Sequence, residues 1–259
     1  DAAGTFRMFG QIAAGVNTLE LRADAQMEIQ TGLSGSVAIT KTGGNRVVIG
    51  GTANVGTTFS GQLNVNEGIW DAQANNALGT AVGSTVIANG ARLELRNGIT
   101  LSDNISVTGN SGGNGAIRNE NNTNVLNGVI TLTGPTEFFV NATQLTISQG
   151  ILGNQALTKT AGGLLILKQD DALSNFNLNG GSVRLSTVNG LGSTSTVSVD
   201  SGESLEFDGS LTFNSGTNLT SLTVNGGTLS GFSGTTTLDI PINLGFFSSI
   251  NFAGAGNLI

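Results

Sequence analysis

The stretch that decides the fold runs over residues 156–185 and reads ALTKTAGGLLILKQDDALSNFNLNGGSVRL. It holds a polar run, a glycine pair, an aliphatic block, an acidic loop, a second glycine pair and an alternating segment. Apolar residues two apart place one face of a strand inward, and nothing here shows the spacing of a helix. An earlier stretch, AITKTGGNRVVI at 38–49, matches ALTKTAGGLLIL at 156–167. The segment is therefore one copy of a repeat.

The match between the two copies continues downstream. The sequence LNVNEGIW aligns with FNLNGGSV, which places Gly68 opposite Gly181. Further along, NNALGTAVGSTVIANGARLEL aligns with NGLGSTSTVSVDSGESLEF, which places Gly90 opposite Gly202. The differences in length between the copies fall in loops, where insertions cost little free energy.

The end of the chain resembles the start of a third copy. Its last residues, AGNLI at 255–259, are similar to the beginnings of the two earlier units. We therefore predict repeat units that start near 38, 156 and 257. A lysine is expected directly after Ile259 or very near it in the gene product, and a stop codon there would contradict this prediction.

A shorter period lies inside each long unit. Turns rich in glycine, asparagine and serine recur at about 22 to 24 residues, which is within the range of solenoid repeats. These turns are Asn66–Gly68, Asn89–Gly90, Asn179–Gly181, Ser201–Gly202 and Asn225–Gly227. Short segments of alternating apolar and polar residues connect them, and a coil of this kind buries its inner face against the next coil.

These periods predict an all-β protein, a β-solenoid of roughly 11 coils. At a strand spacing of about 4.8 Å, its body would be about 50 Å long. We expect one elongated domain over residues 37–259, which is a fragment of a longer chain. Residues 1–36 fit the repeat poorly and are expected to form N-terminal coils or a cap.

The composition excludes several classes of function. The chain has a net charge of −7 and 10 lysines and arginines in 259 residues, so it lacks the basic surface that nucleic acids require. It contains no cysteine and no histidine, which excludes thiolate and imidazole chemistry and metal sites built from those ligands. No apolar run is long enough for a membrane-spanning helix. We expect no cofactor, no metal ion and no direct insertion of this segment into a membrane.

The sequence L-T-K-T-A-G-G-L-L-I-L, followed by an NGG turn and N-G-L-G, resembles the passenger-associated transport repeat, also called the autotransporter-associated β-strand repeat. The matching residues of the second copy are Thr158, Lys159, Thr160, Gly162, Gly163, Leu165 and Leu167. Those of the first copy are Thr40, Lys41, Thr42, Gly43, Val47 and Ile49. This copy matches less well, because Asn45 and Arg46 stand where the second glycine is expected.

The resemblance covers most of residues 37–259. It implies a right-handed parallel β-helix, which is the passenger of an autotransporter displayed on the surface of a Gram-negative bacterium. It further implies an extracellular location and a role of the repeat in folding and transport. The repeat lysines and glycines, together with Gly227, are expected to be structural.

Few residues suggest chemistry. Asp170 and Asp171 are the one adjacent acidic pair, and a short turn of solvated or capping carboxylates is the favoured interpretation. Glu94 and Glu206 match between the copies and are expected to point outward from strands. For the single tryptophan, Trp70, a partly buried packing role is favoured over stacking on a sugar.

The late phenylalanines leave two alternatives open. They could stack inside the solenoid, or Phe246 and Phe247 could form an exposed contact surface together with the edge at Ile259.

We expect a non-catalytic structural or adhesive shaft segment whose partners are cell-surface glycans or proteins, or a second copy of itself. One alternative is a filament or sheath subunit that stacks end to end, because an open solenoid end exposes a β edge. A second alternative is a polysaccharide-active enzyme, which would require Asp170, Asp171 and another acidic residue to converge.

Overall fold

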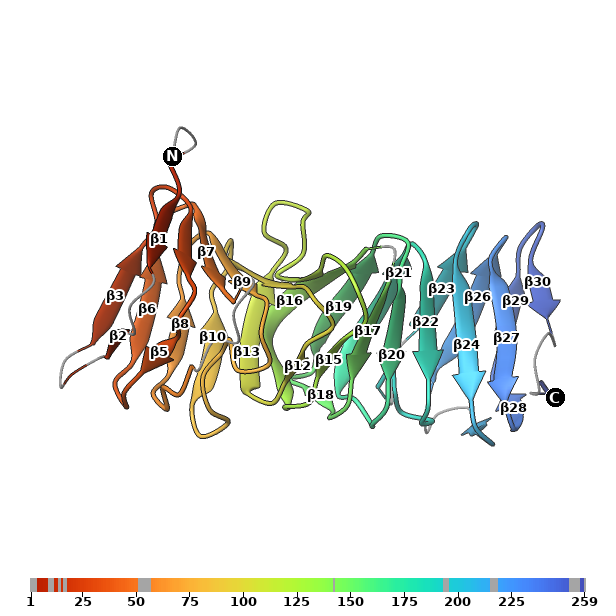
Figure 1. The fold of residues 1–259 in the computed structure, drawn as a ribbon. Helices are drawn as coiled ribbons and strands as arrows, with labels where there is room; N and C mark the ends of the chain where they lie inside the picture. The colour runs from red at the N-terminus through yellow and green to blue at the C-terminus, as the bar shows by residue number, and fades with distance from the viewer. Residues whose placement is uncertain are drawn as a thin grey trace.

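The protein is a long rod of stacked β-strands, as a computed structural model shows (Figure 1). The structure describes residues 4–8, 12–13, 15, 18–50, 57–141, 143–192, 196–214, 219–251 and 257–258. Its strands follow one another in parallel coils of about 11 turns, and the described residues contain no helix. The all-β solenoid predicted from the repeat is thereby confirmed.

Three parallel ladders run along the rod and form its faces. The first ladder contains β3 (Leu19–Arg22), β6 (Ile39–Thr42), β8 (Leu63–Val65), β10 (Ser84–Ile87), β13 (Asn104–Gly109), the first part of β16 (Ile130–Val140) and β18 (Ile151–Leu152). The second contains β1 (Phe6–Met8), β4 (Met27–Ile29), β7 (Arg46–Ile49), β9 (Ile69–Ala72), β11 (Arg92–Leu95), β14 (Ile117–Asn119), the last part of β16, β19 (Gln155–Thr160), β21 (Leu173–Asn179), β23 (Thr196–Asp200), β26 (Ser221–Asn225) and β29 (Ile242–Leu244).

The third ladder begins later in the chain. It contains β12 (Thr100–Leu101), β15 (Asn124–Leu126), β17 (Gln144–Ile147), β20 (Leu164–Leu167), β22 (Ser182–Leu185), β24 (Ser204–Asp208), β27 (Thr228–Ser233) and β30 (Ser249–Asn251). Two short ladders complete the structure: β2 (Ile12–Ala13) with β5 (Leu33–Ser34), and β25 (Thr212–Asn214), β28 (Thr235–Asp239) and β31 (Asn257–Leu258).

Strand β16 joins the first and second ladders into one sheet. Its 11 residues pass from one face to the next, so it pairs with both β13 and β14 on the preceding coil. On the following coil it pairs with both β18 and β19. The pairing of β13 with β16 shifts register between Val107 and Gly109.

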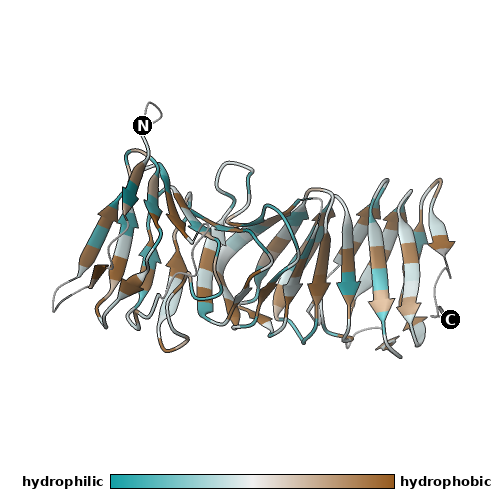
Figure 2. Cartoon of the chain, viewed as in Figure 1, coloured by the Kyte–Doolittle hydropathy of each residue, from teal (hydrophilic) through white to brown (hydrophobic). Residues whose placement is uncertain are grey.

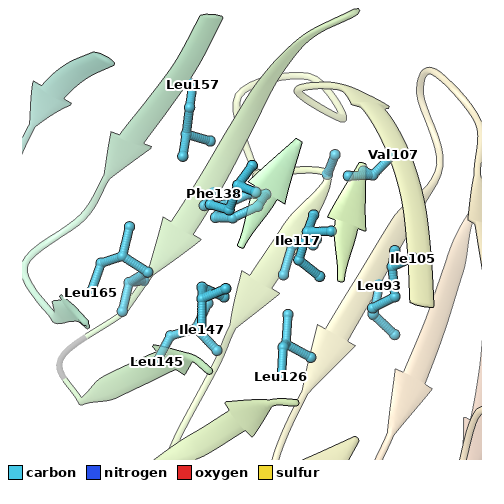
Figure 3. Packing of buried hydrophobic residues seen from close by; sticks show 14 of the residues in the cluster. Leu93, Ile105, Val107, Ile117, Leu126, Phe138, Leu145, Ile147, Leu157 and Leu165 are labelled. Carbon is cyan, nitrogen blue, oxygen red and sulfur yellow. The ribbon is translucent and has the colours of Figure 1, made fainter. Parts of the chain in front are cut away.

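The core is a continuous column of apolar side chains inside the coils. The inward positions of one ladder lie directly above one another, as in the row of Leu93, Ile117 and Phe138, all of which are fully buried. Figure 3 shows these side chains directed into the space that the strands enclose. Figure 2 shows apolar bands that recur on successive strands, which is the alternation read from the sequence.

The N-terminal region continues the same ladders. Strand β3 pairs in register with β6, and β4 pairs in register with β7, so residues 18–50 form ordinary coils of the rod. In the part of the chain that the structure describes, no helix is long and apolar enough to cross a membrane.

Candidate functional site

The first repeat lysine, Lys41, lies inside the rod at the corner between β6 and β7. Its side chain is fully buried, and Nζ donates to the carbonyl oxygens of Thr42 (3.1 Å) and Gly43 in its own turn. Nζ also donates to the Glu67 carbonyl on the next coil, at 2.8 Å. The ammonium thus holds the turns of two successive coils together. We call this the first lysine corner.

The second repeat lysine, Lys159, forms the same arrangement between β19 and β20. Nζ donates to the carbonyls of Thr160 (3.5 Å) and Ala161 (2.6 Å), and to Gly180 on the next coil at 2.6 Å. Lys159 is also fully buried. We call this the second lysine corner. Because the ammonium groups reach carbonyls and not solvent, the lysines serve the fold and offer no surface for a ligand.

The glycines aligned between the two copies lie at equivalent places one coil later. Gly68 has φ +65° and packs on the turn of the first lysine corner, where a Cβ would come within 2.6 Å of Lys41 Nζ. Gly181 has φ +67° and packs on the turn of the second, where a Cβ would come within 2.5 Å of the Gly163 carbonyl oxygen. At both places the next coil approaches too closely for a side chain.

The other motif residues have less uniform surroundings. Thr42 donates to Glu20 at 2.5 Å, and Thr160 donates to Glu137 at 2.8 Å, in each case to a carboxylate of the preceding coil. Thr158 accepts from Asn177, while Thr40 is half-buried on β6. Gly43 and Gly163 lie against backbone of the preceding coil, and Gly227 lies against the Val199 carbonyl. Open space surrounds Gly162, and also Gly90 and Gly202, which have a positive φ.

Burial changes the ionisation of both lysines. Desolvation lowers the pKa of Lys41 to about 8, against the opposing attraction of Glu67 and Asp24. Desolvation lowers the pKa of Lys159 to about 8 as well, where Glu203 is the opposing charge. The two ammonium groups are therefore close to losing their charge slightly above neutral pH.

Asp170 and Asp171 have separate structural partners. The Asp171 carboxyl is buried and accepts from the Ile151 backbone N–H at 2.6 Å, while Asp170 accepts from the Asn189 side chain at 3.2 Å. Burial raises the pKa of Asp171 to about 8, with a smaller contribution from Asp170. Among the described residues no group of three acidic side chains is placed to hold a metal ion.

Trp70 is more buried than the sequence suggested. Its side chain lies on β9, is fully enclosed in the core and donates from Nε1 to the Ala77 carbonyl at 3.1 Å. It cannot stack on a sugar from this position. Glu206 lies on β24 and pairs with Arg184 of the preceding coil at 2.7 Å, in keeping with an outward strand residue.

Glu94 points away from the core, but it is not a solvated surface residue. It belongs to a cluster of charged side chains on the second ladder, which we call the arginine–carboxylate cluster. Its members come from four neighbouring coils and are Arg46, Asp71, Arg92, Glu94, Arg96, Arg118 and Glu120. Four of the seven arginines of the chain gather here.

The carboxylates of the cluster lie beneath the arginines. The side chains of Asp71 and Glu94 are 1% and 2% exposed. Arg46 forms ion pairs with both, and Arg96 reaches the same two from the other side. Farther along the row, Arg118 pairs with Glu120 and packs over the ring of Phe139, at 4.2 Å from its centroid.

In this cluster, the effect of burial on each pKa is opposed by neighbouring charges of opposite sign. Burial raises the pKa of Asp71, while Arg46 opposes this shift and the nearby Glu94 adds to it. Burial would lower the pKa of Arg46, but Asp71 and Glu94 outweigh it and the pKa is raised. One buried oxygen of Asp71, Oδ1, has no hydrogen-bond partner. Arg96 Nε is also buried and makes no hydrogen bond, but it lies 3.4 Å from Asp71 Oδ2 in an ion pair.

A hollow of about 540 Å³ opens beside this cluster. Its floor is formed by Val48 and Gly50, which carry no long side chain, and Arg46 of the same coil also lines it. One wall comes from the preceding coil with Gln26, Glu28 and Gln30, and the other from the following coils with Asp71, Gln73 and Arg96.

A second hollow of similar size, about 540 Å³, lies against β13, β16 and β19. Its lining includes Asn89, Thr108, Asn110, Glu137 and the motif residue Thr158. None of its lining residues carries a buried polar side-chain atom without a hydrogen-bond partner, unlike Asp71 and Arg96 at the first hollow.

The sequence contains a signal for the cluster that the repeat comparison did not use. Charged residues of opposite sign recur one coil apart in a strand or directly after one, as Arg46 and Asp71 do, and Arg96 and Glu120. A spacing of 24 or 25 residues, close to the coil period found for the glycine turns, therefore indicates such contacts between charges.

Two of the three expected contact residues lie on the surface. Phe246 and Phe247 occupy the turn after β29 and are 91% and 95% exposed. Phe247 has φ +63°, an uncommon conformation for a bulky residue. The third, Ile259, lies outside the described residues.

Comparisons with known proteins found no match for the chain. No family model, no curated protein and no solved structure matches it.

Proposed function

We propose that this chain is a non-catalytic shaft segment of an autotransporter-like surface protein, which presents contact surfaces along a stiff rod outside the cell. The observation that carries the proposal is the continuous core enclosed by parallel ladders over about 11 turns. Each coil is bonded to the next through the backbone, so bending the rod would break many hydrogen bonds at once.

The buried lysines support a mechanical role. Each lysine joins two successive turns through hydrogen bonds from its buried ammonium group. Burying that charge costs desolvation free energy, which a lysine on the surface would not lose. The composition agrees with export, because a chain without cysteine cannot form wrong disulfides in an oxidising compartment.

Electron microscopy of negatively stained protein, combined with its mass by light scattering, tests the proposed rod. We expect monomeric rods about 50 Å long, from about 11 coils at about 4.8 Å each. Compact globules would contradict the proposal. For the location, antibodies should label intact cells of the native organism, whereas labelling after permeabilisation alone would contradict a place on the surface.

Self-assembly into a filament is a second candidate, and Phe246 and Phe247 are the observation in its favour. Two almost fully exposed aromatic side chains in one turn are an apolar surface that association would bury. Leu244 and Ile250 nearby are also exposed. Long fibres under the microscope that shorten in a Phe246→Ser, Phe247→Ser variant would support it, and monomers at high concentration would contradict it.

A further inference from the structure

We propose that the hollow over Val48 and Gly50 is a binding site for a neutral, hydroxyl-rich oligosaccharide that lies along the rod. The inference rests on the proposed function, since it gives the shaft one of the glycan contacts expected of an adhesive surface protein. It assigns that contact to the side of the rod and not to an end.

The hollow is built by the side-chain sizes on successive coils. Val48 pairs in register with Glu28 on the coil before and with Asp71 on the coil after. A valine between two longer acidic residues leaves a gap in the outward row. Gly50 extends the gap, since it has no side chain, while its neighbour on the next coil is Gln73. The lining spans four coils, which is about 14 Å along the axis.

The walls of the hollow carry flat polar groups. Gln26 and Gln30 both donate to Glu28, and Gln73 donates to Asp71 at 3.2 Å, so each side chain is held in place by a neighbour. Amides, carboxylates and guanidinium groups each offer two atoms in one plane, which suits adjacent hydroxyl groups that both donate and accept. Asp71 Oδ1 has no hydrogen-bond partner among the described residues and adds an acceptor, while Arg96 Nε lies 3.4 Å from Asp71 Oδ2.

The balance of charge selects a neutral ligand. Glu28 and Asp71 in the lining are matched by Arg46 and Arg96, and the two arginines are already engaged by carboxylates. An acidic ligand would therefore have to displace an existing ion pair. A protein partner is disfavoured because the lining has one aliphatic residue, Val48, and lacks the aromatic anchors of strong protein interfaces.

Calorimetry with defined oligosaccharides tests the site. The probes are neutral hexasaccharides of glucose, mannose and N-acetylglucosamine, with hexagalacturonic acid as the acidic comparison. We expect at least one neutral probe to bind the full chain with a Kd of about 1 mM or tighter. Removing hydrogen bonds from one wall with Gln73→Ala should weaken that binding by about fivefold.

Two further variants distinguish the site from the rest of the surface. Val48→Trp fills the floor of the hollow and should abolish binding, with retained rod shape under the microscope as the check on folding. Gln62→Ala removes an exposed glutamine that donates to Ser84 near β8 and β10, and should leave binding unchanged.

Three results would overturn the site: no neutral probe binds at about 10 mM, hexagalacturonic acid binds more tightly than every neutral probe, or Val48→Trp binds as the parent does. Rods that fail to bind would overturn the site and leave the shaft proposal standing. Compact globules would overturn the shaft proposal independently of any binding.

Discussion

The two lysine corners have nearly the same sequence and the same hydrogen bonds, yet they lie on different faces of the rod. Lys41 is on β6 of the first ladder, in the inward row with Leu21 and Val65. Lys159 is on β19 of the second ladder, in the inward row with Phe138 and Leu178. The repeat therefore describes a strand, a turn and a strand at one corner, and its two copies occupy two different corners of the coil.

The corners also differ in where the chain approaches the preceding coil. At the first, a Cβ on Gly43 would come within 2.6 Å of the Ala23 carbonyl oxygen, while Asn45 carries a side chain without difficulty. At the second, Ala161 takes the place of Gly43 at φ +66°, and Gly163 takes the place of Asn45. A Cβ on Gly163 would collide with the Asn141 carbonyl oxygen. The neighbouring coil thus decides which position of the motif must be glycine.

Loss of either lysine should have the largest effect. Lys41→Met and Lys159→Met each leave buried carbonyl groups without a donor, and we expect each to lower the free energy of unfolding by about 3 kcal/mol. Denaturant unfolding measures the loss, and hydrogen exchange should place the loosened amides at the altered corner. Lys168→Met, which changes an exposed lysine, is the control. A loss at one corner alone would mean that the two are not equivalent.

The second-largest effect is expected from alanine substitutions in the turns, which should destabilise the two lysine corners at different positions. We expect Gly163→Ala to cost about 2 kcal/mol because the backbone must move, whereas Gly162→Ala, with open space around it, should stay within about 0.5 kcal/mol of the parent. At the first corner the order is reversed, so that Gly43→Ala is costly and Asn45→Ala is not. Equal effects of all four variants on the melting temperature would contradict the assignment of the close contacts.

The pH dependence should be alike at both corners. The pKa of each lysine is lowered from 10.5 to about 8, so the native state binds fewer protons than the unfolded state between these values. Stability contributed by each lysine should rise over pH 8 to 10.5, by at most about 1 kcal/mol per pH unit. Each methionine variant should remove its own share of the rise when melting is followed against pH.

Asp171 should change the stability with pH in the opposite direction to the lysines, and at lower pH. Its pKa is raised from 3.8 to about 8, so the native state holds the proton longer and stability falls as pH rises from about 4 to 8. Asp171→Asn keeps an acceptor for the Ile151 N–H and should flatten this fall. An unchanged slope in the variant would mean that the carboxyl is ionised in the native protein. In the Asp171→Asn variant, the change of stability with pH above pH 8 can then be assigned to the two lysines.

The smallest effect is expected at Ala161. An alanine at φ +66° is strained, so Ala161→Gly should raise the free energy of unfolding by up to about 1 kcal/mol. It would bring the second lysine corner closer to the first, where glycine already occupies this place. A drop in the melting temperature would show that the alanine methyl group contributes packing that outweighs the strain.

The sequence by itself determined the class of fold, the coil length and the corner motif. Strand alternation and coil-spaced turns follow from which residues can be buried and which can adopt a positive φ, and both are local properties. The lysine and the glycine one coil later are also visible in it, because Lys41 and Gly68 recur together as Lys159 and Gly181.

Three features were decided by the tertiary structure. The first copy of the repeat lies between the first and second ladders and the second copy between the second and third, and this placement depends on how successive coils pair. The arginine–carboxylate cluster and the hollow over Val48 exist because side chains from different coils meet. Trp70 is enclosed for the same reason. Register between coils sets these contacts, and the sequence of a single coil carries the residues without their neighbours.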